Sequence, residues 1–129
     1  MKIRLYKFIF LGTLFFLLPA FSVEAATLFL STKSGNVTIG DKLEVDVKID
    51  SEDIGFNAAQ ATIQFPKDIL EVTALDRSSS VFNLWLQDPI FSNQDGNLSF
   101  IGGGTSGFSG KSLEILKIVF KVKGSGTAN

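Results

Sequence analysis

The sequence predicts an all-β fold, a sandwich or a barrel, for residues 26–129. From residue 27 onward apolar and polar residues alternate, as they do in a strand with one buried face. Turn-forming residues interrupt this alternation at intervals of about eight to twelve residues, which is the spacing of short antiparallel strands. No segment repeats its apolar residues with the period of about 3.6 that a helix requires. The 129 − 25 = 104 residues that follow the N-terminal segment are enough for one domain.

The first extended segments are predicted from the alternation and from the turns between them. They are 27–31, 36–39, 42–50, 58–65 and 69–75. Segment 42–50 is the clearest strand, because its apolar residues face one side and its charged residues the other. Segment 58–65 alternates as well, and we expect it to direct three polar side chains to solvent, those of Gln60, Thr62 and Gln64. Pro66 then turns the chain.

The second half of the domain is less regular. Segment 81–91 fits neither period and contains Pro89, so we expect a strand with an irregular flap. The Asp-Gly pair at 95–96 is a hairpin signal that leads into a strand at 97–101. Segment 102–110 holds five glycines in nine residues, which is typical of a tightly turned loop and not of a core strand.

Segment 113–123 is the last long strand that the pattern predicts. Its inward side chains are expected to be Leu116, Ile118, Phe120 and Val122. Its outward side chains are expected to be Ile115, Lys117, Val119 and Lys121. Residues 124–129 then end the chain without a closing strand.

Residues 1–25 have the three parts of a secretory signal peptide. Three positive charges lie in the first seven residues, an apolar run follows at 8–21, and Val23 and Ala25 occupy the positions that precede a cleavage site. The apolar run is shorter than the ~20 residues that cross a bilayer as a helix. We therefore expect cleavage after Ala25, a protein that is secreted or held at the cell surface, and no membrane insertion after cleavage. An uncleaved anchor is the alternative.

The composition of residues 26–129 excludes several classes of function. Nine basic and twelve acidic residues give a net charge of 9 − 12 = −3, without the concentrated positive field that nucleic-acid binding requires. The chain has no Cys and no His, which removes thiol chemistry, thiolate metal sites and His-based catalysis. Oxygen ligands from a loop such as 51–57 could hold a calcium ion, but the spacing of the acidic residues matches no calcium loop. Solvated loop charges are the better explanation for Asp41, Asp46, Asp50, Glu52, Asp53 and Asp95. We expect no enzyme activity, no cofactor and no bound metal.

Two kinds of residue are candidates for binding. The outward rows of three predicted strands would form one flat polar face if these strands are neighbours: Gln60, Thr62, Gln64, Ser99, Ile101, Lys117, Val119 and Lys121. An ordinary solvated sheet has much the same composition. Trp85 is the only candidate for stacking on a sugar, because the domain has no Tyr and most of its Phe residues fall on inward positions or in turns. Packing in the core is the alternative role for Trp85.

Seven segments, taken in order, resemble a cohesin domain. They are Ala26–Ser31, Val37–Asp41, Gly55–Ala59, Phe65–Val72, Gly96–Phe100, Gly107–Gly110 and Leu116–Lys123. Each is an ordinary strand-and-turn pattern, and the resemblance depends on their order and spacing through nearly all of residues 26–128. It implies a nine-stranded antiparallel β-sandwich of jelly-roll topology, grouped with carbohydrate-binding modules. In this family the Gly-Thr-Ala at 126–128 usually introduces one more strand, so the domain is expected to be incomplete at its C-terminus, with its last strand missing.

The resemblance also implies a function. Cohesins are non-catalytic modules that dock a dockerin-type partner through one sheet face, in extracellular polysaccharide-degrading assemblies such as cellulosomes or in surface display. The contacting strands of the family correspond here to 58–65, 81–86, 97–101 and 113–123, which carry most of the outward rows. The Asn and Asp that some members use for this contact align with Ala58 and Gln60. Two alternatives stay open: a module that binds polysaccharide directly through Trp85, and an adhesin-like structural spacer.

Overall fold

The computed structural model describes residues 26–33, 35–51 and 55–128. Within these residues it contains strands and no helix. The strands are β1 (Thr27–Thr32), β2 (Lys42–Asp50), β3 (Phe56–Gln64), β4 (Leu70–Asp76), β5 (Leu84–Ser92), β6 (Asn97–Phe108) and β7 (Leu113–Val122). The all-β prediction is confirmed, whereas the predicted signal peptide lies outside the described residues. In the part of the chain that is described, no helix is long and apolar enough to cross a membrane.

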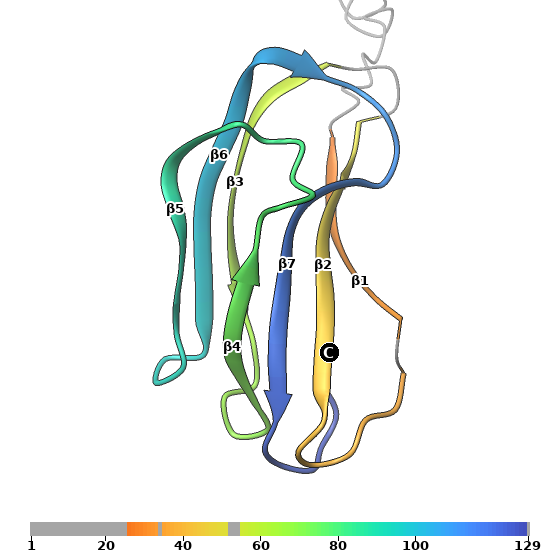
Figure 1. The fold of residues 1–129 in the computed structure, drawn as a ribbon, viewed down its shortest axis with the longest axis vertical. Helices are drawn as coiled ribbons and strands as arrows, with labels where there is room; N and C mark the ends of the chain where they lie inside the picture. The colour runs from red at the N-terminus through yellow and green to blue at the C-terminus, as the bar shows by residue number, and fades with distance from the viewer. Residues whose placement is uncertain (1–25, 34, 52–54, 129) are drawn as a thin grey trace, which may run out of the picture.

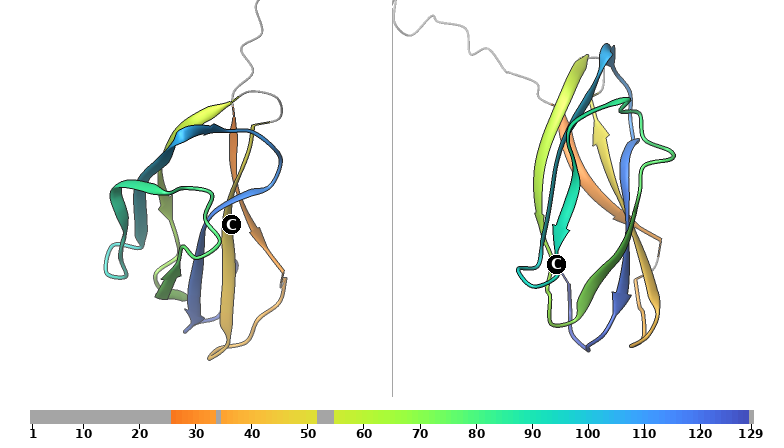
Figure 2. Two further views of the ribbon diagram at one scale, coloured as in Figure 1. Left: turned by 45° about the horizontal axis from the view of Figure 1, so that its top comes forward. Right: turned by 60° about the vertical axis from the view of Figure 1, so that its left-hand side comes forward.

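The strands form two antiparallel sheets that pack face to face (Figures 1 and 2). The four-stranded sheet has the order β1-β2-β7-β4, and the three-stranded sheet has the order β3-β6-β5. The chain crosses from one sheet to the other four times, on each side of β3 and of the β5–β6 hairpin, so that β2 pairs with β7 and β3 with β6. This nesting of pairs is the expected jelly-roll topology. The described residues form seven strands, where the resemblance implies nine.

The hydrophobic core lies between the sheets and is built from the inward sides of the middle strands. Six large side chains are less than 2% exposed: Phe100, Leu98, Ile115, Leu116, Ile118 and Val47. The alternation predicted for β2 is confirmed, because Val47 and Ile49 are buried while Glu44 is exposed. The alternation predicted for β3 is confirmed too: its polar outward residues are exposed, and its inward residues are half-buried.

One position in β7 faces the opposite way from the prediction. We expected Ile115 to point outward, but its side chain is fully buried. The register between β2 and β7 shifts here, since Val47 lies opposite Leu116 while the next residue, Lys48, lies opposite Glu114. A bulge of this kind inserts one extra residue, and Ile115 and Leu116 then both turn inward. Strict alternation cannot predict such a position.

Strand β6 runs through the glycine-rich segment that was predicted to be a loop. It extends from Asn97 to Phe108. A Cβ atom at Gly102 would lie 2.7 Å from the Phe82 ring and 2.8 Å from the Trp85 ring. Glycine occupies the strand because aromatic rings pack directly against its backbone. The prediction of a loop was therefore wrong for residues 102–108, which belong to β6.

The short extended piece predicted at 36–39 belongs to neither sheet, and its last residue, Ile39, begins a turn. The Thr38 N–H donates to the Asp41 carboxylate at 2.8 Å, and the Thr38 carbonyl accepts from the Asp41 N–H at 2.9 Å. A short acidic side chain that bonds to nearby backbone in this way stabilises a turn instead of a strand ladder. The segment therefore connects β1 to β2 without joining either sheet.

A side-chain clamp ties the β5–β6 hairpin to the edge of the four-stranded sheet. The Asn93 amide oxygen accepts from the Val72 N–H at 2.7 Å, and its nitrogen donates to the Val72 carbonyl at 3.0 Å. Val72 lies on β4, an outer strand of its sheet. Asn93 thus satisfies both backbone groups of one edge residue, as a neighbouring strand would. These two hydrogen bonds also link the three-stranded sheet to the four-stranded sheet.

Candidate functional site

The outer face of the three-stranded sheet brings together five of the eight residues predicted to bind a partner. Gln60, Thr62 and Gln64 lie on β3, and Ser99 and Ile101 lie on β6. The two strands pair so that Gln60 is opposite Ile101 and Thr62 is opposite Ser99. Cross-strand neighbours on one face have Cβ atoms about 5 Å apart. This part of the predicted face is therefore one continuous surface.

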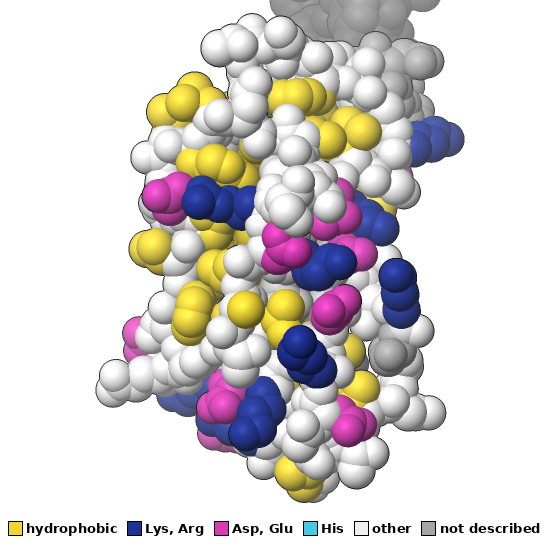
Figure 3. All heavy atoms as spheres, viewed as in Figure 1, with side chains coloured by type: hydrophobic (Ala, Val, Ile, Leu, Met, Phe, Trp, Pro, Cys, Tyr) yellow, Lys and Arg dark blue, Asp and Glu magenta, His cyan; other side chains and the backbone are white. Residues whose placement is uncertain are grey.

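Strand β5 adds a row of exposed aliphatic side chains next to this surface. Leu84 is opposite Gly103 of β6, and Ile90 is opposite Ser99. The exposed fractions are 48% for Leu84, 72% for Leu86 and 58% for Ile90, all high for large apolar side chains. In Figure 3 hydrophobic side chains are visible along the left-hand side of the molecule, where β5 runs.

This aliphatic row was not among the predicted site residues. Segment 81–91 fits neither period because the β5–β6 register shifts twice, once at Leu86 and again between Gln87 and Ile90. One signal in the sequence could have revealed it. Leucines at 84 and 86, in a segment that also contains Asp88 and Pro89, indicate an edge strand with apolar residues on its accessible side.

A hydrogen bond between β5 and β6 orders two polar side chains in the middle of the outer face of the three-stranded sheet. The Gln87 side-chain nitrogen donates to the Ser99 hydroxyl at 2.9 Å, and Gln87 itself is opposite Ile101. Both side chains are half-buried. The face therefore presents aliphatic groups on β5, an ordered amide and hydroxyl in the middle, and amides on β3. Groups that are already ordered lose little conformational entropy when a partner binds.

The other three predicted binding residues lie on the opposite sheet. Lys117, Val119 and Lys121 belong to β7, whose neighbours are β2 and β4. Val119 is only 8% exposed, so little of it is accessible to a partner. The prediction of one face formed by all eight residues was wrong, because the crossing from β6 to β7 moves the last strand into the other sheet.

Trp85 lies on β5, is half-buried, and packs against the hydrophobic core. Its ring packs edge-on against Phe82 and Phe100, with centroid distances of 5.6 Å and 6.0 Å. The Arg77 guanidinium lies 5.3 Å from the ring centroid and is bound by the Asp88 carboxylate at 2.5 Å. Stacking on a sugar needs an open ring face. Here core aromatics and Arg77 make those contacts, which favours the packing role.

The outer faces of the two sheets differ in charge. Strands β3 and β6 contain no charged residue, and β5 contains only Asp88. Strands β2 and β7 carry charges of both signs, which Figure 3 shows over the middle of the view. One pair among them joins the Lys117 ammonium and the Glu44 carboxylate at 3.9 Å. Such exposed pairs contribute little to stability and are typical of a solvated face.

Among the described residues, the carboxyl group of Asp76 has a shifted pKa, and it lies away from the outer face of the three-stranded sheet. The Ser78 backbone N–H donates to the Asp76 carboxylate at 2.8 Å and lowers the pKa of Asp76 from its ordinary value. Asp76 is the last residue of β4, in the four-stranded sheet. This hydrogen bond stabilises the turn that follows the strand and takes no part in the candidate site.

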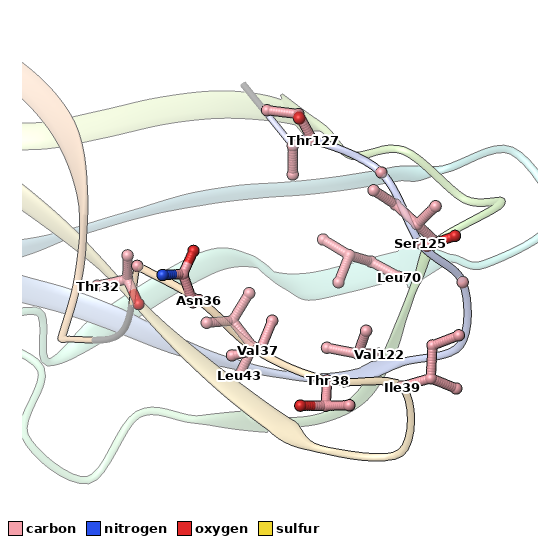
Figure 4. A pocket seen from close by; sticks show the side chains of 15 residues that line it. Thr32, Asn36, Val37, Thr38, Ile39, Leu43, Leu70, Val122, Ser125 and Thr127 are labelled. Atoms are coloured by element: carbon pink, nitrogen blue, oxygen red, sulfur yellow. The ribbon is translucent and has the colours of Figure 1, made fainter.

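A cavity of about 620 Å³ opens at one end of the sandwich, away from the aliphatic row (Figure 4). Leu43, Leu70 and Val122 provide apolar lining, and the segments 35–39 and 124–128 form the rest. No charged side chain lines it. The described residues also contain no group of three or more His, Cys, Asp or Glu side chains placed to hold a metal ion. The cavity offers neither an acid–base pair nor a metal site.

Solved structures of cohesins share this fold. The chain is similar to the sixth cohesin of scaffoldin B from Acetivibrio cellulolyticus, solved with a mutant Cel5 dockerin, with 23% identity, a TM-score of 0.61, and coverage of 79% of this chain and 74% of that chain. A type II cohesin in a cohesin–X-dockerin complex from the same organism has 13% identity, a TM-score of 0.60, and coverage of 81% and 75%. The second type II cohesin of its adaptor scaffoldin ScaA has 14% identity, a TM-score of 0.58, and coverage of 83% and 75%.

A search among curated proteins finds no match. At identities below 25%, the structural likenesses show the fold alone. The family model of the cohesin domain, however, matches residues 26–129, which include every described strand. The two-sheet arrangement and this family match agree, and the chain belongs to the cohesin family.

Proposed function

We propose that this chain is a secreted, non-catalytic module that docks a dockerin-type protein through the outer face of its three-stranded sheet. The observation that carries the proposal is the exposed aliphatic row of β5 beside the uncharged rows of β6 and β3. Membership of the cohesin family supports it, and two similar solved structures are cohesins in complex with dockerins. The setting we propose is an extracellular polysaccharide-degrading or surface-display assembly.

The composition of the face fits a protein partner. The centres of protein–protein interfaces are poor in charged residues and rich in apolar ones, with polar groups around them. Leu84, Leu86 and Ile90 supply the apolar part, and Gln60, Thr62 and Gln64 supply hydrogen-bonding groups without charge. The mixed charges of the four-stranded sheet lack this composition. Of the two outer faces, the three-stranded one is the better docking surface.

Binding to dockerin modules tests the proposal directly. The exported protein is titrated by calorimetry with a panel of dockerins, beginning with those encoded in the same genome. We expect one-to-one binding to at least one of them, with a dissociation constant of about 1 µM or tighter. Insoluble cellulose and chitin provide the comparison, and the covered ring of Trp85 leads us to expect no retention on either.

The same experiment separates the alternative functions. Retention on a polysaccharide without capture of any dockerin would favour a direct carbohydrate-binding module. Binding to neither kind of ligand would favour a structural spacer. Either result contradicts the docking proposal.

Export of the chain has its own test. We expect that expression of the whole chain in a secreting bacterium releases a protein that begins at Ala26, because residues 1–25 have the charge, apolar run and cleavage site of a signal peptide. Intact-mass spectrometry of the released protein measures this. The Ala25→Phe variant is the control, since a bulky side chain next to the cut should keep the leader attached. Recovery of the full mass from membranes would instead indicate an anchor.

A further inference from the structure

The second register shift of β5 decides which of its side chains face outward. From Gln87 to Ile90 strand β5 advances three residues, while β6 advances two, from Ile101 to Ser99. One extra residue is inserted here, as in a β-bulge. Two residues three positions apart in a regular strand would face opposite sides of the sheet. The bulge instead places Gln87 and Ile90 on the same side, opposite two residues of the outer face.

On the outer face, one hydrogen bond spans this bulge. Ser99 is opposite Ile90, so the 2.9 Å bond from the Gln87 side-chain nitrogen to the Ser99 hydroxyl crosses the bulge diagonally. The bulge itself contains Asp88 and Pro89, and neither has a register partner on β6. A proline also has no N–H to donate. The conformation of the bulge therefore depends strongly on contacts made by its side chains.

Arg77 approaches the bulge from the other sheet. It directly follows β4 and begins the segment that leads across to β5 (Figure 1). The Arg77 carbonyl accepts from the Ser80 N–H at 3.0 Å, and the Asp76 carboxylate accepts from the Ser78 N–H at 2.8 Å. Local bonds of this kind stabilise a turn. The side chain of Arg77 therefore extends from an ordered point at the end of β4.

The Arg77 guanidinium makes two contacts with β5. It donates to the Asp88 carboxylate at 2.5 Å, and it lies 5.3 Å from the centroid of the Trp85 ring. That ring is itself held by Phe82 and Phe100. An exposed ion pair alone is weak, because two long side chains must be ordered to form it. Here the ring already restricts the guanidinium, so Asp88 meets an ordered partner.

We propose that Arg77 is a positioning residue for the docking surface, because through Asp88 it fixes the bulge that presents Gln87 and Ile90. This inference rests on the proposed function, since it takes the outer face of the three-stranded sheet as the surface that meets dockerin. A bulge that already has its bound conformation loses less conformational entropy on docking. Loss of Arg77 would therefore weaken binding through the arrangement of β5.

Two variants and their combination test this role by calorimetric titration with dockerin. Arg77→Gln removes the charge of the guanidinium, and Asp88→Asn removes the charge of its partner. Each should weaken binding about three- to fivefold, and the double variant should lose no more than either alone, because all three lack the same contact. Lys117→Gln is the matched control: it removes a cation from an exposed pair with Glu44 on the other sheet and should bind dockerin normally.

The free protein provides a second measurement that needs no dockerin. The side-chain amide of Gln87 gives its own signal in heteronuclear NMR spectra, and this signal reports the hydrogen bond to Ser99. We expect Arg77→Gln and Asp88→Asn each to shift it toward the position of a glutamine in water. The side-chain signal of Gln60, on β3, should stay in place. Circular dichroism confirms that each variant is folded.

The outcomes separate this inference from the proposed function. An unchanged Gln87 signal in both variants overturns the positioning role, and so does a shifted signal with unchanged dockerin binding. Additive losses in the double variant also overturn it, because Arg77 and Asp88 would then act separately. An equal loss in Lys117→Gln would indicate a general effect of charge. If the unchanged protein binds no dockerin, the proposed function fails, and the Gln87 signal alone decides whether Arg77 positions the bulge.

Discussion

Replacing Gly103 with alanine is expected to lower the free energy of unfolding by about 3 kcal/mol, the upper part of the range for overpacking a well-packed site. The added Cβ would overlap the carbonyl oxygen of Asn57 and lie 2.9 Å from the Cα of Ala58. Both are backbone atoms of β3, the strand that pairs with β6 at this point. A side chain could rotate out of the way, but these atoms move only if the whole of β3 moves.

Thermal unfolding followed by circular dichroism measures this effect. For a domain of about 100 residues, a loss of this size lowers the melting temperature by roughly 10–20 °C. Gly107→Ala is the matched control, because it lies on the same strand and its Cβ would come closest to the movable Asn57 side chain, at 3.2 Å. A Gly103→Ala protein as stable as this control would show that β3 does not lie against β6 as described.

The same residue illustrates what the sequence could not predict. A run of glycines is usually a loop, because glycine weakens a strand. Here Gly102 and Gly103 lie inside β6, since the Phe82 and Trp85 rings and the β3 backbone take the space that side chains would fill. Those neighbours are distant in sequence, so the reason for the glycines becomes visible only when the chain is folded.

The best predictions rest on local alternation. The bounds of β2 match the predicted 42–50, and the polar row of β3 points outward as expected. Alternation reports which side of a strand faces the core, and this depends on neighbouring residues only. It fails at Ile115 and around Leu86, where register shifts reverse the sides.

The candidate site could be predicted only in part for a related reason. Five residues of the predicted face come together because β3 and β6 are neighbours, whereas β7 joins the other sheet. Which sheet a strand joins depends on its pairing with strands that are distant in sequence. The alternation of residues within one strand does not show this pairing. The exposed aliphatic row of β5 was not predicted, because the two register shifts of this strand interrupt the alternation of its residues. Its leucines, Leu84 and Leu86, can nevertheless be read from the sequence.

Leu86→Asp is expected to weaken dockerin binding by about 3 kcal/mol, roughly 100-fold, if the docking proposal holds. Leu86 is the most exposed of the large apolar side chains in the described residues, at 72%, and it lies beside Leu84 on the aliphatic row. A carboxylate at this position would have to lose its water inside an apolar contact. Because the side chain is mostly in solvent in the free protein, the free energy of unfolding should change by only about 0.5 kcal/mol.

Calorimetric titration with the dockerin that binds the unchanged protein measures the loss, and a second variant isolates its cause. Ile39→Asp makes a similar change at a side chain that is 61% exposed but lies at the end of the sandwich, beside the cavity. It should bind dockerin as the unchanged protein does. Equal losses in both variants would point to a general effect of charge. Full binding by Leu86→Asp would remove β5 from the interface, and with it the observation that distinguishes the three-stranded face from an ordinary solvated sheet.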